Sequence, residues 1–118
     1  MDNPVVVEAR KYLETVDFVI DLYDKSFVWA SEKVLQIAGY TSSEFTKLHT
    51  FDTLDKSVDQ EAYKKELAEE LANKHGTTTV LCNTKVGKKV RLTIEYQIFE
   101  LNGGWYRAAK ALKVDMLQ

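Results

Sequence analysis

Two groups of side chains in this sequence could act as acids, bases or nucleophiles. Asp52 and Asp55 place two carboxylates close together, and Cys82 is the only cysteine. General acid–base catalysis would need such carboxylates in a cleft that shifts a pKa. The two aspartates directly precede an expected helix, where the helix dipole stabilises negative charge. We therefore expect them to be structural, and we expect no catalytic residues and no enzymatic activity in this chain.

The two histidines give no metal-site pattern. Neither His49 nor His75 has a Cys, Asp or Glu partner at the spacing of metal ligands. His75 falls at the C-terminal end of an expected helix, where the dipole favours a cation, and His49 falls in a polar, solvent-facing loop. Cys82 falls on an expected strand and would pack there as a small hydrophobe. A single cysteine cannot form an internal disulfide, so the sequence favours a reducing, cytoplasmic setting.

Length and charge limit the possible partners. A chain of 118 residues is long enough for one domain with a real core. Its net charge of −2, with acids and bases interspersed, argues against a nucleic-acid surface, which needs clustered basic residues. No apolar run reaches membrane-spanning length, and Asp2 stands where a signal peptide would carry bases. We expect no direct contact with nucleic acid and no membrane contact by this segment.

The first two thirds of the chain predict a short hairpin and several helices. Gly39 suits the left-handed end of a helix, and Thr41 and Glu44 have the spacing of a capping box that opens the next one. Ser57 and Gln60 form a second such spacing. In order, the expected elements are a helix from Pro4 to about Thr15, strands at Phe18–Tyr23 and Phe27–Ala30, a helix capped by Ser31, a helix from Thr41 to about Leu48, and a turn at Thr50–Asp55. The longest helix is expected from about Val58 to Asn73, with Gly76 as its stop. Its inward side chains would be Val58, Tyr63, Leu67 and Leu71.

The last third changes to a period of two. Alternating apolar and polar residues predict a half-buried strand at Val90–Ile98. Strands at 77–84 and 105–114 flank it, joined through turns at Lys85–Lys88 and Asn102–Gly104. Strand runs separated by a helical block indicate an α+β fold rather than a parallel sheet. The sequence predicts a five-stranded antiparallel sheet with a helical cap on one face, and periodicity leaves the strand order open.

Three short motifs resemble those of PAS domains. Residues 39–45, Gly-Tyr-Thr-Ser-Ser-Glu-Phe, are similar to the family's Gly-Tyr-Ser/Thr-x-x-Glu-Leu/Phe turn. Residues 83–90 resemble its Lys-Asp-Gly turn, and residues 114–116 its closing Asp-Ile-Thr strand. The resemblance divides the chain into an N-terminal flanking helix at 1–16 and a PAS domain at 17–118. Val86, Ser31 and Met116 depart from the family's usual Asp, Asn and Ile, and Leu117 replaces its terminal Thr or Ser.

The resemblance implies a strand order of 2-1-5-4-3 and a sensory role. Such a module would bind a small molecule between sheet and cap, or dimerise, and so regulate an output domain, as in bacterial sensor histidine kinases. A ligand-free protein–protein interaction module is the alternative. Residues 48–54 lack the reactive cysteine of flavin-binding photoreceptor domains, and the long helix lacks a haem-binding histidine. We therefore expect neither haem nor flavin, and any bound ligand would be an unidentified small molecule.

The resemblance also suggests two sets of site residues. Aromatic and apolar side chains of the cap and sheet are candidates for lining a ligand pocket, although ordinary core packing is the simpler interpretation. The pocket candidates are Trp29, Leu35, Phe45, Phe51, Tyr63, Leu67 and Tyr96. An apolar stripe on the N-terminal helix has nothing obvious to cover, so we expect a homodimer formed through Val5, Ala9 and Tyr12.

Overall fold

Five antiparallel strands form one sheet, in the order β2-β1-β5-β4-β3. The computed structural model describes residues 3–117. Residues 1 and 2 of the predicted flanking helix at 1–16, and residue 118 of the predicted domain at 17–118, lie outside the described residues. The strands are β1 (Phe18–Asp21), β2 (Phe27–Ala30), β3 (His75–Asn83), β4 (Lys89–Leu101) and β5 (Gly104–Leu117). The expected α+β fold and its strand order are therefore confirmed.

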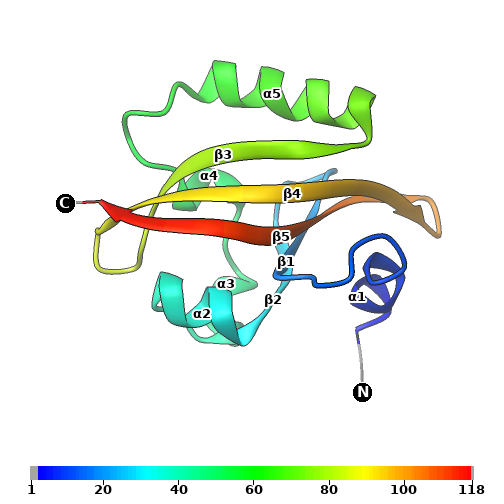
Figure 1. Ribbon diagram of the computed structural model, residues 1–118, viewed down its shortest axis with the longest axis horizontal. Helices are drawn as coiled ribbons and strands as arrows, with labels where there is room; N and C mark the ends of the chain where they lie inside the picture. The colour runs from blue at the N-terminus through cyan, green and yellow to red at the C-terminus, as the bar shows by residue number, and fades with distance from the viewer. Residues whose placement is uncertain (1–2, 118) are drawn as a thin grey trace.

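Helices surround this sheet on both faces (Figure 1). They are α1 (Pro4–Ala9), α2 (Glu32–Ala38), α3 (Ser42–Phe45), α4 (Thr50–Thr53) and α5 (Gln60–Asn73). Figure 1 shows the three long strands β3, β4 and β5 side by side, with α5 running along β3 and α2 and α3 lying below them. No helix in the described part of the chain is long and apolar enough to cross a bilayer.

The chain between α2 and α3 forms as its sequence predicts. Gly39 ends α2 with a φ of 82°, a left-handed conformation that costs glycine little. The Thr41 hydroxyl accepts the Glu44 N–H at 3.1 Å, and the Glu44 carboxylate accepts the Thr41 N–H at 3.0 Å. This capping box satisfies two backbone donors at the start of α3 and fixes the direction in which the chain leaves α2.

The start of α5 differs from the prediction. Asp59, not Ser57, is the N-cap, and its carboxylate accepts the Glu61 N–H at 3.0 Å. The Ser57 N–H and hydroxyl both donate to the Asp55 carboxylate, so Ser57 is not free to cap a helix. The helix therefore begins at Gln60, and Val58 lies outside it.

The last residue of α5 is Asn73, as predicted, but the residue that stops the helix differs. Lys74, whose φ is 71°, is its C-cap, while His75 and the expected stop Gly76 are the first residues of β3. Along α5 the buried side chains are Tyr63 and Leu67, as predicted, followed by Glu70. Leu71, predicted to face inward, is 39% exposed. Glu70 is buried in its place, because its carboxylate forms an ion pair with Arg107.

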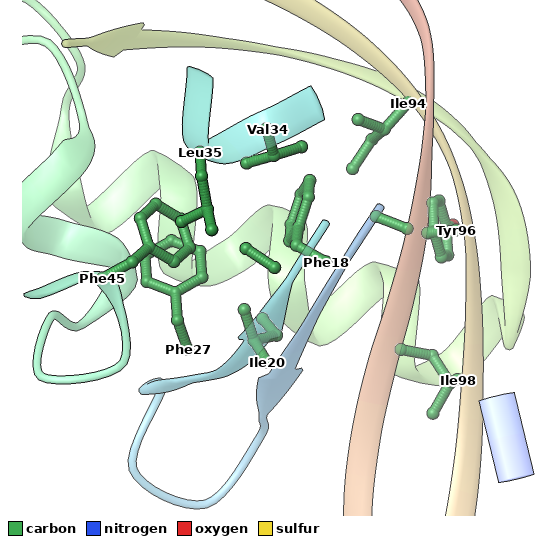
Figure 2. Close-up of a cluster of buried hydrophobic side chains, with 11 residues drawn as sticks. Phe18, Ile20, Phe27, Val34, Leu35, Phe45, Ile94, Tyr96 and Ile98 are labelled. Carbon is green, nitrogen blue, oxygen red and sulfur yellow. The ribbon is translucent and has the colours of Figure 1, made fainter. Parts of the chain in front are cut away.

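The main core lies between the inner face of the sheet and the cap (Figure 2). Phe18 and Ile20 of β1 meet Ile94, Tyr96 and Ile98 of β4 there, and Phe27, Val34, Leu35 and Phe45 close the cluster from the other side. The rings of Phe27 and Phe45 lie 4.3 Å apart between centroids. This contact fixes α3 against β2 and so sets the height of the cap above the sheet.

A second core lies on the outer face and involves the N-terminal segment. Asn3 caps α1 by accepting the Val5 N–H at 2.9 Å. The helix ends at Ala9, well before the predicted Thr15, and the N–H groups of Lys11 and Tyr12 donate to carbonyls three residues back, those of Glu8 and Ala9, which tightens the last turn. Figure 1 shows α1 lying apart from the cap, near the end of the sheet where β4 turns into β5. The residues of this cluster are Val6, Ala9, Leu13, Val16, Val19, Phe99 and Ala108.

Candidate functional site

An apolar pocket of about 80 Å³ lies between the inner face of the sheet and the cap. Strands β1 to β5 and helices α2 to α5 all contribute to its wall. Most of the lining side chains are apolar. The polar ones are Thr50, Thr53, Tyr63, Cys82, Asn83, Thr84 and Arg107. A mostly apolar pocket with a few converging polar groups is the common form of a small-molecule site.

Three polar atoms on this wall have no hydrogen-bond partner. They are Thr50 Oγ1, Asn83 Oδ1 and Arg107 Nε. Every other buried side-chain oxygen or nitrogen atom within residues 3–117 has a hydrogen-bond partner. Thr50 is near enough to Tyr63 to stabilise its ionised form, although the two hydroxyls do not form a hydrogen bond. Buried polar groups are normally paired, so three unpaired atoms around one pocket mark it as a place for a polar guest.

Arg107 is the charged residue of the pocket wall. In the register of the sheet it lies between Ile20 of β1 and Ile98 of β4, both of which face the inner core. Only 2% of its surface is exposed. Its Nη1 donates to Glu70 Oε1 at 2.7 Å, so one ion pair connects α5 to the middle of the sheet.

Burial shifts the pKa values of the groups near Arg107. Desolvation raises the pKa of Glu70, and the adjacent Arg107 opposes that rise. Burial likewise raises the pKa of Tyr63, and it raises the pKa of Cys82 to about 11. The Cys82 thiol is therefore protonated and unreactive at neutral pH.

No protein-family model and no curated protein matches this sequence. Solved structures do. A PAS domain from a two-component sensor histidine kinase superposes with a TM-score of 0.69 at 10% identity, covering 96% of this chain and 97% of that one. A PAS domain of a Desulfitobacterium hafniense protein gives 0.65 at 21% identity, covering 86% and 99%. A light-oxygen-voltage domain studied with a flavin analogue gives 0.66 at 18% identity, covering 94% and 87%.

The chain has a PAS-domain fold. These identities are low, so the likeness concerns the fold, and the site must be argued from this chain's own residues. The pocket lies between sheet and cap, where the resemblance to PAS domains placed a ligand.

Four of the seven pocket candidates lie in the core cluster or on the pocket of this PAS fold. Phe45 and Tyr63 line this pocket. Leu35 and Tyr96 belong to the inner core but do not line it, because their side chains are used in packing α2 and β4. They are therefore part of the support of the pocket rather than of its wall.

The other three candidates lie elsewhere. Phe51 and Leu67 line a wider groove of about 440 Å³ between α4, α5 and the β1–β2 turn, together with Lys25, Lys64 and Leu71. This groove has no buried unpaired polar atom on its wall. The prediction for Trp29 is wrong, because it pairs with Val19 and packs on the outer-face cluster.

The predicted dimer stripe is also corrected. Ala9 has no exposed surface, because α1 folds back on the outer face of its own sheet. Val5 is half-buried against the same cluster. Tyr12 is 48% exposed, although its ring stacks on Phe99 at 5.7 Å between centroids. The stripe therefore has a partner within the chain, and only Tyr12 offers substantial surface to a second copy.

The remaining chemistry-bearing residues take structural places. Asp52 accepts the His49 N–H at 2.8 Å at the start of α4, as an N-terminal carboxylate should. His49 and His75 are exposed and away from the pocket. Cys82 lies on β3, as predicted, and its side chain lines the pocket. Residues 3–117 contain no group of three His, Cys, Asp or Glu side chains placed to hold a metal ion.

Sequence reasoning missed the polar residues of the pocket. Arg107 falls within the strand predicted at 105–114, where a charged residue is typical of the solvent-facing side. The sequence does contain an indication that Arg107 faces inward. Alternate residues of a strand face the same side of the sheet, and Arg107 alternates with the small apolar residues Ala109 and Ala111, which are buried. Glu70 had no comparable signal, because it is one of several acids on the charged side of α5.

Proposed function

We propose that this PAS domain is a sensory module that binds a small molecule in the inner pocket and regulates an output domain of its parent protein, such as a bacterial sensor histidine kinase. The observation that carries this proposal is the set of three unpaired polar atoms around the apolar pocket. A buried polar group without a partner costs about 1–3 kcal/mol. A ligand that supplies partners recovers part of this cost, which favours occupancy.

The wall of the pocket suits signalling as well as binding. It joins residues of α5 to residues of the central strand β5, through Tyr63 and Arg107. A ligand that changes how these residues pack would change the position of α5 relative to the sheet. A coupling of about 1–3 kcal/mol between ligand and output states is sufficient for regulation.

We propose that neither flavin nor haem is the ligand. A pocket of about 80 Å³ is smaller than the engineered cavity of about 150 Å³ that binds benzene, and the ring systems of both cofactors are far larger than benzene. Neither histidine reaches the pocket, and the Cys82 thiol is held protonated. A small metabolite fits these limits.

We further propose that the module acts in the cytoplasm as a homodimer. Tyr12 and the nearby Val7, which is 44% exposed, are the apolar surface of the N-terminal segment that a second copy could cover. Light scattering on Tyr12→Glu and wild type tests this: loss of a dimer in the variant supports it, and a monomeric wild type refutes it. The parent protein's output domain would be the second partner.

A ligand-free interaction module is the second candidate. The small volume of the pocket favours it, because water alone could satisfy three polar atoms. In that case the exposed rings of Tyr12 and Trp105 would be contacts for a protein partner.

A pocket-filling substitution distinguishes the two candidates. Val80 lines the pocket from β3, whereas the exposed Thr79 beside it faces away and contacts Thr93. Purified wild type, Val80→Phe and Thr79→Phe would be compared by native mass spectrometry, absorbance and an NMR screen of small metabolites. A sensor binds a small molecule in wild type and Thr79→Phe but not in Val80→Phe. Absence of any bound molecule in all three proteins refutes the sensory proposal.

A further inference from the structure

We propose that the pocket binds a short-chain carboxylate of about the size of acetate. This carboxylate binds the free Nε edge of the Arg107 guanidinium and competes with the Glu70 carboxylate for the positive charge of Arg107. This inference rests on the proposed function, because it names the ligand class of the same pocket. It commits to an anion, which the proposed function does not require.

The first argument is the state of the Arg107 guanidinium. It is the one charged group among the described residues that line the pocket, and 98% of the residue's surface is covered. Nη1 donates to Glu70, while the Nε–H has no partner. A guanidinium presents parallel N–H donors that match the two oxygens of a carboxylate. The unused Nε edge is therefore preformed for an oxyanion.

The second argument is the chemistry of the surrounding wall. Thr50, 3% exposed, has an unpaired hydroxyl that can donate to a carboxylate oxygen. The rest of the wall is largely apolar, with Val80 and Leu92 among its residues, and suits a methyl group. Asn83 Oδ1 is an acceptor, so it would face a bridging water rather than the carboxylate. One end of the pocket thus suits an anion and the remainder suits a short alkyl group.

The third argument is size. An engineered cavity of about 150 Å³ holds the six carbon atoms of benzene, so a pocket of about 80 Å³ corresponds to roughly three or four heavy atoms. Formate has three heavy atoms and acetate has four. Longer acids and dicarboxylates exceed this space.

The fourth argument concerns charge balance. With Glu70 ionised, the Glu70–Arg107 pair is neutral, and an entering anion would leave one excess negative charge in a buried site. Glu70 can remove that excess by taking up a proton, since burial already raises its pKa. The groups that face the pair are Glu66 and Tyr63 from α5 and Cys82 from β3, and Glu66 further favours protonation of Glu70. Acetate should therefore bind more tightly as the pH falls, down to the pH at which acetate itself takes up a proton.

The release of Glu70 would carry the signal. Glu70 is the side chain through which the C-terminal half of α5 is bonded to β5. When acetate occupies Arg107, that bond weakens, and amide hydrogen exchange in α5 should become faster. A structural ion pair that no ligand reaches would show no such change.

An NMR titration with sodium acetate tests the inference, with sodium chloride at equal ionic strength and neutral acetamide as comparisons. Three proteins are needed: wild type, Glu70→Gln, and the matched control Glu69→Gln, which makes the same change at an exposed position of α5. We expect saturable shifts around Thr50, Cys82 and Arg107 with acetate alone. Glu70→Gln should bind acetate at least fivefold more tightly, because the competing carboxylate is gone, and Glu69→Gln should match wild type. Arg107→Lys, which keeps the charge but loses the fork, should bind more weakly.

Three results would overturn the inference. Equal binding of acetate and acetamide, with no gain in Glu70→Gln, would show a pocket for neutral ligands and leave the proposed function intact. If the NMR chemical shifts change with acetate without saturating, or change equally with sodium chloride, the changes would be general ion effects only. If neither acetate nor any molecule of the metabolite screen binds, both the inference and the proposed function fail.

Discussion

The Tyr96 ring lies directly over Gly76, its partner across β3 and β4. A β-carbon built on Gly76 would be 2.9 Å from the Tyr96 hydroxyl oxygen and 3.1 Å from the ring carbon that bears it. On its other side Tyr96 pairs with Ala109, so the large ring is packed between two small residues. Because Tyr96 is 4% exposed, it has little freedom to move aside.

We expect Gly76→Ala to destabilise the fold through this clash. Overpacking of a tight core typically costs about 1–3 kcal/mol, which urea unfolding would measure. The cost should be smaller in a Tyr96→Leu background, where the ring is gone, and a double-mutant cycle would isolate this coupling. An unchanged free energy of unfolding in Gly76→Ala would contradict the packing described.

A second prediction concerns Glu44 and Lys85. Lys85 Nζ donates to Glu44 Oε2 at 2.6 Å, and this hydrogen bond, with those from Thr41, lowers the pKa of Glu44 to about 2. A carboxylate with a lowered folded-state pKa stabilises the fold above its unfolded pKa, near 4.5, and loses that effect as the pH falls through about 2. Lys85→Met should raise the Glu44 pKa towards its ordinary value, as an NMR titration would show.

Lys88→Met is the control for this experiment, because Lys88 is exposed in the same turn and bonds to Thr84 through its backbone, whose N–H donates to the Thr84 hydroxyl and whose carbonyl accepts the Thr84 N–H. It removes the same charge but leaves the Glu44–Lys85 bond intact. An equal shift of the Glu44 pKa in both variants would mean that general charge, not the hydrogen bond, sets it.

A third prediction concerns the docking of α1. Ala9 has no exposed surface and packs against Phe99 and Ala108 of the outer face. In Ala9→Glu the carboxylate would be buried without a partner, so we expect α1 to leave the sheet rather than a dimer to dissociate. Hydrogen exchange should accelerate in α1, and the melting temperature should fall. Thr15→Glu, which introduces the same charge at an exposed position of the N-terminal segment, should leave both near wild type.

Local signals in the sequence predict most of this fold because the caps and turns are self-contained. The Thr41–Glu44 capping box and the turn at Asn102 and Gly103, with φ values of 51° and 84°, depend on residues within a few positions of each other. The predicted role of Gly76 was wrong because a glycine after a helix resembles a helix stop, whereas Gly76 lies in β3. Its real constraint is the Tyr96 ring, 20 positions away in the sequence, which local patterns cannot report.

The pocket could be predicted only in part for the same reason. Phe45 and Tyr63 were found because aromatic residues near a cap are conspicuous. Arg107 and Glu70 become a site only when β5 and α5 meet, 37 positions apart in the chain. The outer-face docking of α1 was missed because the sequence does not show which sheet face is free to receive Ala9.

The final prediction concerns the reactivity of Cys82. Burial raises its pKa to about 11, even though the nearby Arg107 lowers it, so desolvation outweighs the positive charge. At pH 8 its thiolate fraction is then about two orders of magnitude below that of a free cysteine, with a pKa near 8.5. Iodoacetamide should therefore alkylate the native protein at least about a hundredfold more slowly than the urea-unfolded protein. The native rate should rise about tenfold per pH unit up to pH 10, since the thiol is still far from half-ionised there. A rate that levels off above about pH 9.5 would show an ordinary exposed thiol with a pKa near 8.5, and Cys82 would then not be on the pocket wall.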